Sequence, residues 1–369
     1  MSRTPSRLRT RLSLFPRAAL NRLTSGRRSA PRDPRRILVA HRLLLGDTLM
    51  LTPMLVRLRR RYPQAEIVMT VSGSFLPLYA TRPYGVRAVP FDPRTRGAAK
   101  KLLEETPFDL ALVPGDNRYA MLALALGSRW VVAMEGDRPG WKNRLADQLI
   151  SVPPEPLALA DMFALLAGAE DGAVFDPRDW SRPQSEAFES PGRDYAVLHV
   201  GASSPLKLWQ AHKWLQVAAG VERKGLESVL CCGPGEEALI ARIDPERRYR
   251  SYAGTLDLVQ LWRLMEGARL FVGLDSGPSH LARLTRTPVV TLYGPGSAQL
   301  LGPGRFWRDQ IYRAVTIADF PCRDQRSLFK REILWVRRCG RSLEECPSPA
   351  CMHAIDADAV LESCEALLR

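Results

Sequence analysis

The chain has 369 residues, of which 46% are hydrophobic and 25% charged, an ordinary globular composition with length for about two domains. No apolar run approaches the roughly 18–20 residues that a membrane-spanning helix needs, which excludes a protein anchored by such helices. The net charge is +14, and residues 1–36 hold eleven arginines and a single acid. The rest of the chain is only weakly basic, so specific nucleic-acid binding is not expected.

The basic N-terminal extension, residues 1–35, allows three interpretations. Leucines and Phe15 lie between its arginines, a pattern typical of an amphipathic segment that binds anionic lipid at a membrane surface. A disordered, solvated tail explains the composition equally well, and an Arg- and Ser-rich organellar transit peptide is the third interpretation. No apolar run is followed by a small-residue cleavage site, so a secretory signal is not expected. We expect a flexible extension that meets an anionic membrane surface.

Residues 36–175 predict a first α/β domain. Short runs that are apolar throughout alternate with helical patterns, which indicates a parallel sheet covered on both faces. Apolar residues spaced i, i+3, i+4 and i+7 predict a helix from Leu51 to Tyr62 with one face in the core. The strands are predicted at 36–41, 66–71, 86–91, 108–114 and 130–134.

Residues 176–194 are rich in Pro, Asp, Ser and Gly and are expected to link this domain to a second one. The alternation then restarts, and residues 195–350 predict a second Rossmann-like domain. The final stretch, 351–369, contains an amphipathic helix that is a candidate for crossing back to the first domain. Strands of the second domain are predicted at 195–202, 228–233, 269–275 and 288–294, and its helices at 211–224, from Glu236, at 258–268 and from Pro278.

Seven cysteines include an adjacent pair inside a predicted strand, best explained as apolar filling, and a group near the C-terminus. The spacing of the C-terminal group matches no zinc-binding pattern. Free thiols in a reducing compartment are therefore expected, with a metal site or disulfides as the alternative. This group consists of Cys322, Cys339, Cys346 and Cys351.

The second domain offers loops with anion-binding character, although neither GxGxxG nor GxxxxGK[ST] occurs, so a dehydrogenase or a P-loop NTPase is poorly supported. In "HVGASSPLKLW", Ser203 and Ser204 follow a strand and Lys207 lies close enough along the chain to meet a phosphate. A polar loop with a solvated lysine is the alternative. In "CGPGEEALI", Glu236 is a candidate for ribose hydroxyls, or simply an acid at a helix N-terminus.

The motif "GLDSGPSHLAR" is more specific. Asp275 and Ser276 end a strand, Gly277 lets a ligand approach the backbone, and the helix that starts there directs its positive end at the strand terminus. His280 lies where it can donate to a phosphate oxygen, with a satisfied core histidine as the alternative. Together the three loops predict a site for a nucleotide diphosphate.

One acid of the first domain would face that site. In "LLLGDTLMLTP", Asp47 follows a strand and a glycine, and the spacing alone fits both a helix cap and a functional group directed at the cleft. An acid on one domain opposite a diphosphate site on the other is an arrangement suited to a transferase.

These motifs, in this order over about residues 36–300, resemble glycosyltransferase family 9, the ADP-heptose:lipopolysaccharide heptosyltransferases. The resemblance implies a GT-B fold: α/β, with two Rossmann-like domains whose parallel sheets face a central cleft. It also implies metal-independent, inverting transfer of a sugar, ADP-heptose being the expected donor, to lipopolysaccharide core or a related glycolipid. The sequence departs from the family at Gln210, where proline is frequent, and at Arg286, where glycine is common.

The resemblance also implies roles for the candidate residues and a place in the cell. Asp47 would be the general base. Ser203, Ser204, Lys207, Ser276, Gly277 and His280 would bind the donor diphosphate, and Glu236 and Asp275 the nucleoside and sugar; no metal or further cofactor is expected. The protein would act at the inner face of the bacterial cytoplasmic membrane. A nucleotide-sugar 2-epimerase or hydrolase of the same fold and a non-catalytic sugar-nucleotide-binding scaffold are the alternatives.

Overall fold

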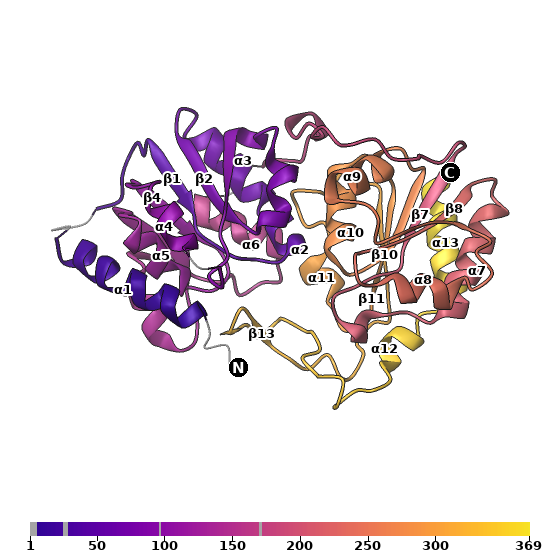
Figure 1. Ribbon diagram of the computed structural model, residues 1–369. Coiled ribbons are helices and arrows are strands. Elements are labelled where there is room, and N and C mark those ends of the chain that lie inside the picture. Colours follow the sequence, from indigo (N-terminus) through magenta and orange to yellow (C-terminus); the bar gives the residue numbers. More distant parts are fainter. Residues whose placement is uncertain (1–5, 25–28, 96, 170–171) are drawn as a thin grey trace, which may run out of the picture.

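The computed structural model describes residues 6–24, 29–95, 97–169 and 172–369, which form two α/β domains lying side by side (Figure 1). Each domain is built on a six-stranded parallel sheet, with strand orders β3-β2-β1-β4-β5-β6 and β12-β11-β10-β7-β8-β9. Both orders are the doubly wound pattern, in which helices cover both faces of the sheet and ligands bind beyond the carboxyl ends of the strands.

Every strand predicted from the sequence is present, and the two six-stranded sheets gain three more, β6, β9 and β12, at their edges. The first sheet consists of β1 (Arg36–Val39), β2 (Glu66–Val71), β3 (Val86–Pro90), β4 (Leu110–Val113), β5 (Trp130–Met134) and β6 (Gln148–Ile150). The second consists of β7 (Tyr195–His199), β8 (Glu227–Cys232), β9 (Arg250–Ala253), β10 (Leu270–Leu274), β11 (Val289–Tyr293) and β12 (Tyr312–Thr316).

The helix predicted over residues 51–62 is preceded by a separate short helix. Pro53 lies in the first turn of the longer one, where its missing N–H costs nothing, and the chain turns at Met50 and Leu51 just before it. The first domain has α2 (Leu45–Leu49), α3 (Thr52–Arg61), α4 (Ala98–Leu103), α5 (Tyr119–Ala125) and α6 (Leu159–Ala164). The second has α7 (Ala211–Glu222), α8 (Glu237–Ile243), α9 (Leu258–Glu266), α10 (Gly277–Leu281), α11 (Ala298–Leu301), α12 (Ala350–His353) and α13 (Ala357–Leu368).

The N-terminal extension corrects an expectation. Residues Ser6–Thr24 form α1, which lies against α5 rather than forming a flexible tail (Figure 1). Leu14 and Ala18 are buried, and the Asn21 side-chain amide donates to the Leu124 carbonyl at 2.9 Å. Residues 1–5 and 25–28 of the extension lie outside the described part. In that part, no helix is both long and apolar enough to cross a membrane.

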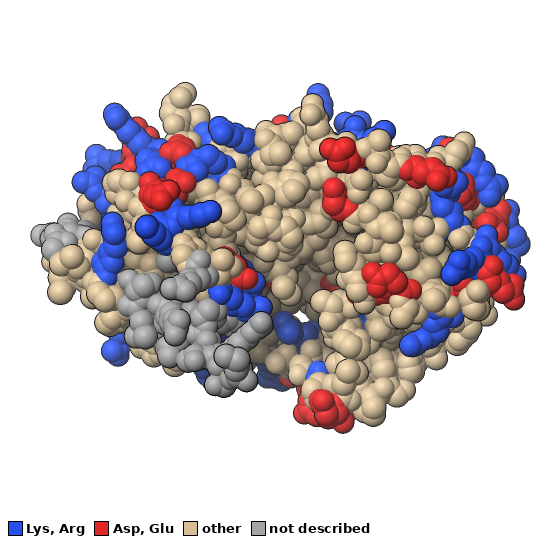
Figure 2. Space-filling model, viewed as in Figure 1, with Lys and Arg blue, Asp and Glu red and all other residues tan. Residues whose placement is uncertain are grey.

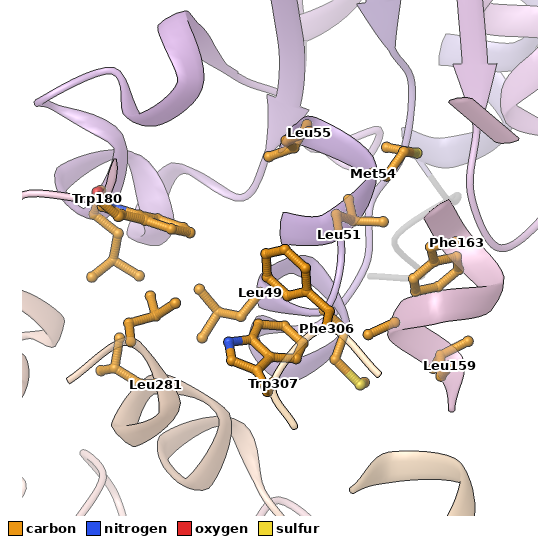
Figure 3. Packing of buried hydrophobic residues seen from close by; sticks show 14 of the residues in the cluster. Leu49, Leu51, Met54, Leu55, Leu159, Phe163, Trp180, Leu281, Phe306 and Trp307 are labelled. Carbon is orange, nitrogen blue, oxygen red and sulfur yellow. Dashed lines mark hydrogen bonds between the residues drawn. The ribbon is translucent and has the colours of Figure 1, made fainter. Parts of the chain in front are cut away.

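The two domains share one buried apolar cluster, seen in Figure 3, where Leu49 of α2 lies among Trp180, Leu281 and Trp307. Trp180 belongs to the predicted linker but is only 1% exposed, and its indole N–H donates to the Leu78 carbonyl of the first domain at 3.1 Å. Its ring also meets Trp262 of α9, with centroids 5.8 Å apart. The linker is therefore packed against both domains, and α2 is held at their interface.

A second connection joins the domains. Residues 317–349, here named the return segment, leave the second domain, form the hairpin β13 (Ser327–Leu328) and β14 (Arg331–Glu332) beside the first, and return (Figure 1). Arg331 is 3% exposed and donates to the Gly115 carbonyl and the Asn117 side-chain oxygen, both at 2.5 Å. The guanidinium thereby satisfies carbonyl groups deep in the first domain.

The C-terminal helix does not cross back, contrary to the expectation for residues 351–369. α13 packs on α7 of the second domain, where Leu361 lies against Gly220 and Glu365 pairs with Lys224 at 2.8 Å. The return segment makes the crossing instead. Its cysteines, like the other cysteines of the chain, are free thiols.

Candidate active site

Asp47 lies on α2, which follows β1 and approaches α10 of the second domain very closely. A Cβ atom at Gly46 would lie 2.6 Å from Cδ2 of His280, and one at Gly277 would lie 2.9 Å from Cδ2 of Leu45. Both distances are too short for any side chain, so a glycine on each helix permits the approach. The two glycines therefore place Asp47 beside the loop that follows β10.

Asp47 does not cap α2, so the capping interpretation is wrong. The N-cap position is Leu44, no side-chain cap is present, and Asp47 falls inside the first turn. Within the described residues, its carboxylate makes no hydrogen bond. The acid is thus left available for another role.

The electrostatic surroundings of Asp47 suit a base. Burial raises the pKa of its carboxyl to about 6, Lys207 and Arg338 act to lower that pKa, and Asp275 acts to raise it. Among the described residues no hydrogen bond supports the ionised carboxylate, and positive side chains stabilise it instead. A carboxylate with this pKa is mostly ionised at neutral pH, yet basic enough to accept a proton.

With Asp47 as the general base, as the resemblance implies, we expect kcat/KM to rise with pH through a pKa near 6, because only the ionised carboxylate can accept a proton. In Lys207→Gln the rise in kcat/KM should occur at higher pH. Without the positive charge of Lys207, burial and the negative charge of Asp275 raise the pKa of Asp47 further. A pH–rate profile of both proteins, with Lys101→Gln as an exposed control on α4, measures the shift. A rise at the same pH in Lys207→Gln would contradict the electrostatic coupling.

Lys207 and Asp275 form the centre of the site on the second domain. The Lys207 ammonium donates to the backbone carbonyl of Asp275 at 2.6 Å and to its Oδ2 at 2.8 Å. Asp275 is 3% exposed, and Gly296, after β11, leaves the space that this carboxylate occupies. The pair joins the loops after β7 and β10 and fixes the lysine opposite α2.

Two buried polar atoms at the start of α10 lack hydrogen-bond partners among the described residues: Oγ of Ser276, in the loop after β10, and Nδ1 of His280, in α10 itself. Burial, with the charges of Arg283 and Lys207, lowers the pKa of His280 well below its ordinary value, so the ring is neutral. Buried polar groups without partners are rare in proteins, and a polar ligand at this loop would satisfy them. His280 can offer such a ligand a hydrogen bond but no charge.

Glu236 connects two neighbouring loops. Its Oε2 accepts the Gly233 N–H at 2.9 Å, and the same carboxylate lies against Gly201 at the end of β7. Ser203 is exposed and Ser204 half-buried on the loop that carries Lys207. These residues share one edge of the second sheet because the carboxyl ends of parallel strands meet there.

The structure therefore brings Asp47, Lys207 and Asp275 together and places His280 against α2. Two contributors were not predicted. Arg338 comes from the return segment, whose sequence has too weak a periodicity to predict its structure. Gly296 belongs to the turn "YGPG", and its sequence alone does not distinguish this turn from other turns that contain Gly and Pro. Figure 2 shows the surface hollowed between the domains, with Lys and Arg side chains at the bottom of the hollow.

Comparison with known proteins agrees with this architecture. The sequence model of glycosyltransferase family 9 (heptosyltransferase) matches residues 96–331. Lipopolysaccharide heptosyltransferase 3 of Escherichia coli (strain K12) is 28% identical over 281 residues, covering 68% of this chain and 79% of the relative.

Solved structures share the fold. A glycosyltransferase family 9 protein from Veillonella parvula DSM 2008 superposes with a TM-score of 0.70 at 18% identity, covering 90% of this chain and 97% of that one. The Escherichia coli heptosyltransferase WaaC, solved with ADP, gives a TM-score of 0.63 at 18% identity, covering 90% and 99%. The chain accordingly belongs to glycosyltransferase family 9 and is a glycosyltransferase with the GT-B fold.

Proposed function

We propose that this protein transfers heptose from ADP-heptose to a hydroxyl of lipopolysaccharide core or a related glycolipid, with inversion at the anomeric carbon and without a metal ion. The observation that carries the proposal is the placement of Asp47, on the first domain, within the electrostatic reach of Lys207 and Asp275 on the second. The names of the relatives support the sugar and the acceptor, and WaaC has been solved with ADP and with ADP-2-deoxy-2-fluoro heptose.

The proposed reaction is a single displacement. The acceptor hydroxyl lies against Asp47, its oxygen attacks the anomeric carbon from the face opposite the diphosphate, and Asp47 takes the hydroxyl proton. The bond between the anomeric carbon and the diphosphate oxygen breaks, and ADP leaves with that electron pair. One displacement at one carbon inverts its configuration.

The leaving diphosphate gains negative charge, and groups of the second domain would stabilise it. Lys207 contributes a full positive charge, while Ser203, Ser204, Ser276, His280 and the Gly277 backbone contribute hydrogen bonds. Lys207 is already bonded to Asp275, so we propose that Asp275 fixes the ammonium in the orientation that the phosphate oxygens require. Glu236, with one oxygen held by Gly233, would accept from the ribose hydroxyls.

Calorimetric binding of ADP, UDP, GDP and CMP, each with and without EDTA, tests the donor. We expect selective binding of ADP that EDTA does not change. A transfer assay with ADP-heptose and lipopolysaccharide core oligosaccharide, read by NMR, then gives the anomeric configuration of the product. Preference for another nucleotide would refute ADP-heptose as donor, and retention of configuration would refute the single displacement.

We further propose that the protein works at the inner face of the cytoplasmic membrane, with α1 at the anionic surface. Phe15, Leu20 and Leu23 of α1 are 59%, 59% and 83% exposed, and arginines surround them in the sequence. Exposed apolar groups among cations are typical of helices that lie in a membrane interface.

Replacing Arg7, Arg9 and Arg11 together by Gln should therefore weaken binding to vesicles that contain anionic phospholipid. Turnover of a water-soluble oligosaccharide acceptor should stay the same. The control is a triple Gln variant at Arg223, Arg308 and Arg313, exposed arginines of the second domain, which should bind vesicles as the unmodified protein does. Vesicle sedimentation measures the binding of the two variants and of the unmodified protein. Equal binding by all three would refute the membrane role of α1.

A further inference from the structure

A cavity of about 310 Å³ lies in the first domain, away from the donor loops. Its wall includes Leu14 of α1, and Trp141, which is 51% exposed, also lines it. Arg42, which follows β1, lines it too, so the cavity lies at the edge where the strands of this sheet end. α1 therefore closes a space that would be open on that side without the N-terminal extension.

Among the described residues, those that are charged and line the cavity are all basic: Arg42, Arg118, Lys142 and Lys330. Aspartates that do not line the cavity hold the first three in place. Arg42 pairs with Asp92 at 2.8 Å, Arg118 with Asp116 at 2.6 Å, and Lys142 with Asp116 at 3.1 Å. Lys330 is exposed and, among the described residues, forms no ion pair. It is the cation that an incoming anion would meet without displacing a carboxylate.

Lys330 comes from the other domain, at the turn of the return segment, and its position is held firmly. Lys330 and Phe329 have φ angles of +64° and +46°, values that cost non-glycine residues free energy and persist only where neighbouring contacts impose them. Phe329 packs on Phe163 of α6, with ring centroids 5.9 Å apart, and Arg331 is anchored inside the first domain. An open hollow of about 670 Å³ continues from Lys330 along Arg138 and Arg326; Glu332, which pairs with Arg138 at 2.9 Å, also lines it.

The cavity is within reach of the reaction. Arg42 is five residues before Asp47, and five residues of fully extended chain span at most about 18 Å. An acceptor of a few sugar residues can therefore place one hydroxyl at Asp47 and another part of the molecule in the cavity.

We propose that the cavity between α1, α5 and the return segment binds an anionic group, a phosphate or a carboxylate, of the glycolipid acceptor. Lys330 pairs with the anion, and Trp141 offers an apolar surface to the adjoining sugar. The proposal rests on the proposed function, because it takes the acceptor of that reaction as its ligand. It assigns to Lys330 and to the N-terminal helix a part in choosing the acceptor.

The test compares Lys330→Gln with Lys101→Gln, an exposed lysine on α4 that lies outside the cavity. The probe is deacylated lipopolysaccharide core oligosaccharide. Loss of a charge-assisted hydrogen bond predicts an increase of about 10-fold or more in the Kd and the KM for this oligosaccharide in Lys330→Gln. The KM for ADP-heptose and kcat should stay within about twofold, and Lys101→Gln should match the unmodified protein.

Chemical treatment of the probe identifies the anion. If phosphatase treatment removes the difference between Lys330→Gln and the unmodified protein, the group is a phosphate; if carboxyl reduction removes it, the group is a carboxylate. Equal Kd values for the untreated oligosaccharide in Lys330→Gln and Lys101→Gln would overturn the proposal. Binding measured without donor separates this outcome from a failure of the proposed function, in which ADP-heptose yields no transfer product.

Discussion

Asp47→Asn should reduce kcat by about 10²–10⁴-fold while leaving the affinity for ADP unchanged, because an amide cannot take the proton from the acceptor hydroxyl. The substitution keeps the size of the side chain, so the packing of α2 on α10 through Gly46 and Gly277 should be preserved. Steady-state transfer and calorimetric ADP binding measure the two effects. Near-normal transfer with intact donor binding would remove Asp47 from the role of base.

The same substitution should make the protein more stable at neutral pH. Burial raises the pKa of Asp47 from 3.8 to about 6, so ionising the carboxyl costs more in the folded than in the unfolded protein. This cost is absent below pH 3.8, grows as pH rises to about 6 and is constant above, and reaches at most about 3 kcal/mol. The side chain is half-buried, so solvent screening reduces that figure.

Thermal unfolding at pH 4 and pH 8 tests this expectation. Asp47→Asn should raise Tm at pH 8 by several degrees and leave it nearly unchanged at pH 4. Asp358→Asn, an exposed acid on α13, serves as the control and should show no such pH dependence. An equal or lower Tm at pH 8 would mean that Asp47 is not under electrostatic strain in the folded protein.

Arg331→Met should destabilise the protein by about 3–5 kcal/mol, the usual effect of removing one member of a buried charged network. The guanidinium donates to the Gly115 and Glu135 carbonyls and to Asn117, and its Nη2 lies 3.8 Å from Oδ2 of Asp137. Methionine fills part of the space but satisfies none of these acceptors. The hairpin of the return segment should consequently separate more often from the first domain.

Two measurements check this expectation. Differential scanning calorimetry should give a lower Tm for Arg331→Met, and limited proteolysis should cut residues 317–349 faster. Arg337→Met is the matched control, because Arg337 is exposed and, within the part of the chain that the structure describes, its side chain donates only to carbonyls of its own segment. If the two variants have the same Tm and the same rate of cleavage, the buried Arg331 does not hold the hairpin against the first domain.

Much of the fold could be predicted because the central strands are apolar on both faces. β6, β9 and β12 were missed for the same physical reason. They lie at sheet edges and expose several side chains, so their sequences, "QLI", "RSYA" and "YRAVT", lack an uninterrupted apolar run. Edge strands depend on a partner strand that is distant in the sequence.

The positions of the candidate site residues could be predicted only where local geometry determines them. Lys207, Asp275 and Gly277 follow strands of a parallel sheet, so their strand-end positions alone place them at one edge. Arg338, which acts to lower the pKa of Asp47, comes from a segment that leaves and re-enters the second domain without a periodic pattern. The amphipathic pattern of α13 did not reveal which domain that helix covers. Likewise, the arginines of α1 concealed that Leu14 and Ala18 form a buried stripe.

The return segment also determines how this chain can be recombined with its relatives. A chimaera that joins one protein's residues 1–175 to another's residues 176–369 would combine Gly115, Asn117 and Glu135 with a foreign arginine and a foreign hairpin turn. The exchangeable unit is therefore discontinuous: the first domain together with residues 317–349 inserted into the second. Exchange of that unit should transfer the acceptor preference as well. Exchange at the linker alone should separate Lys330 from the first-domain residues that line the same cavity.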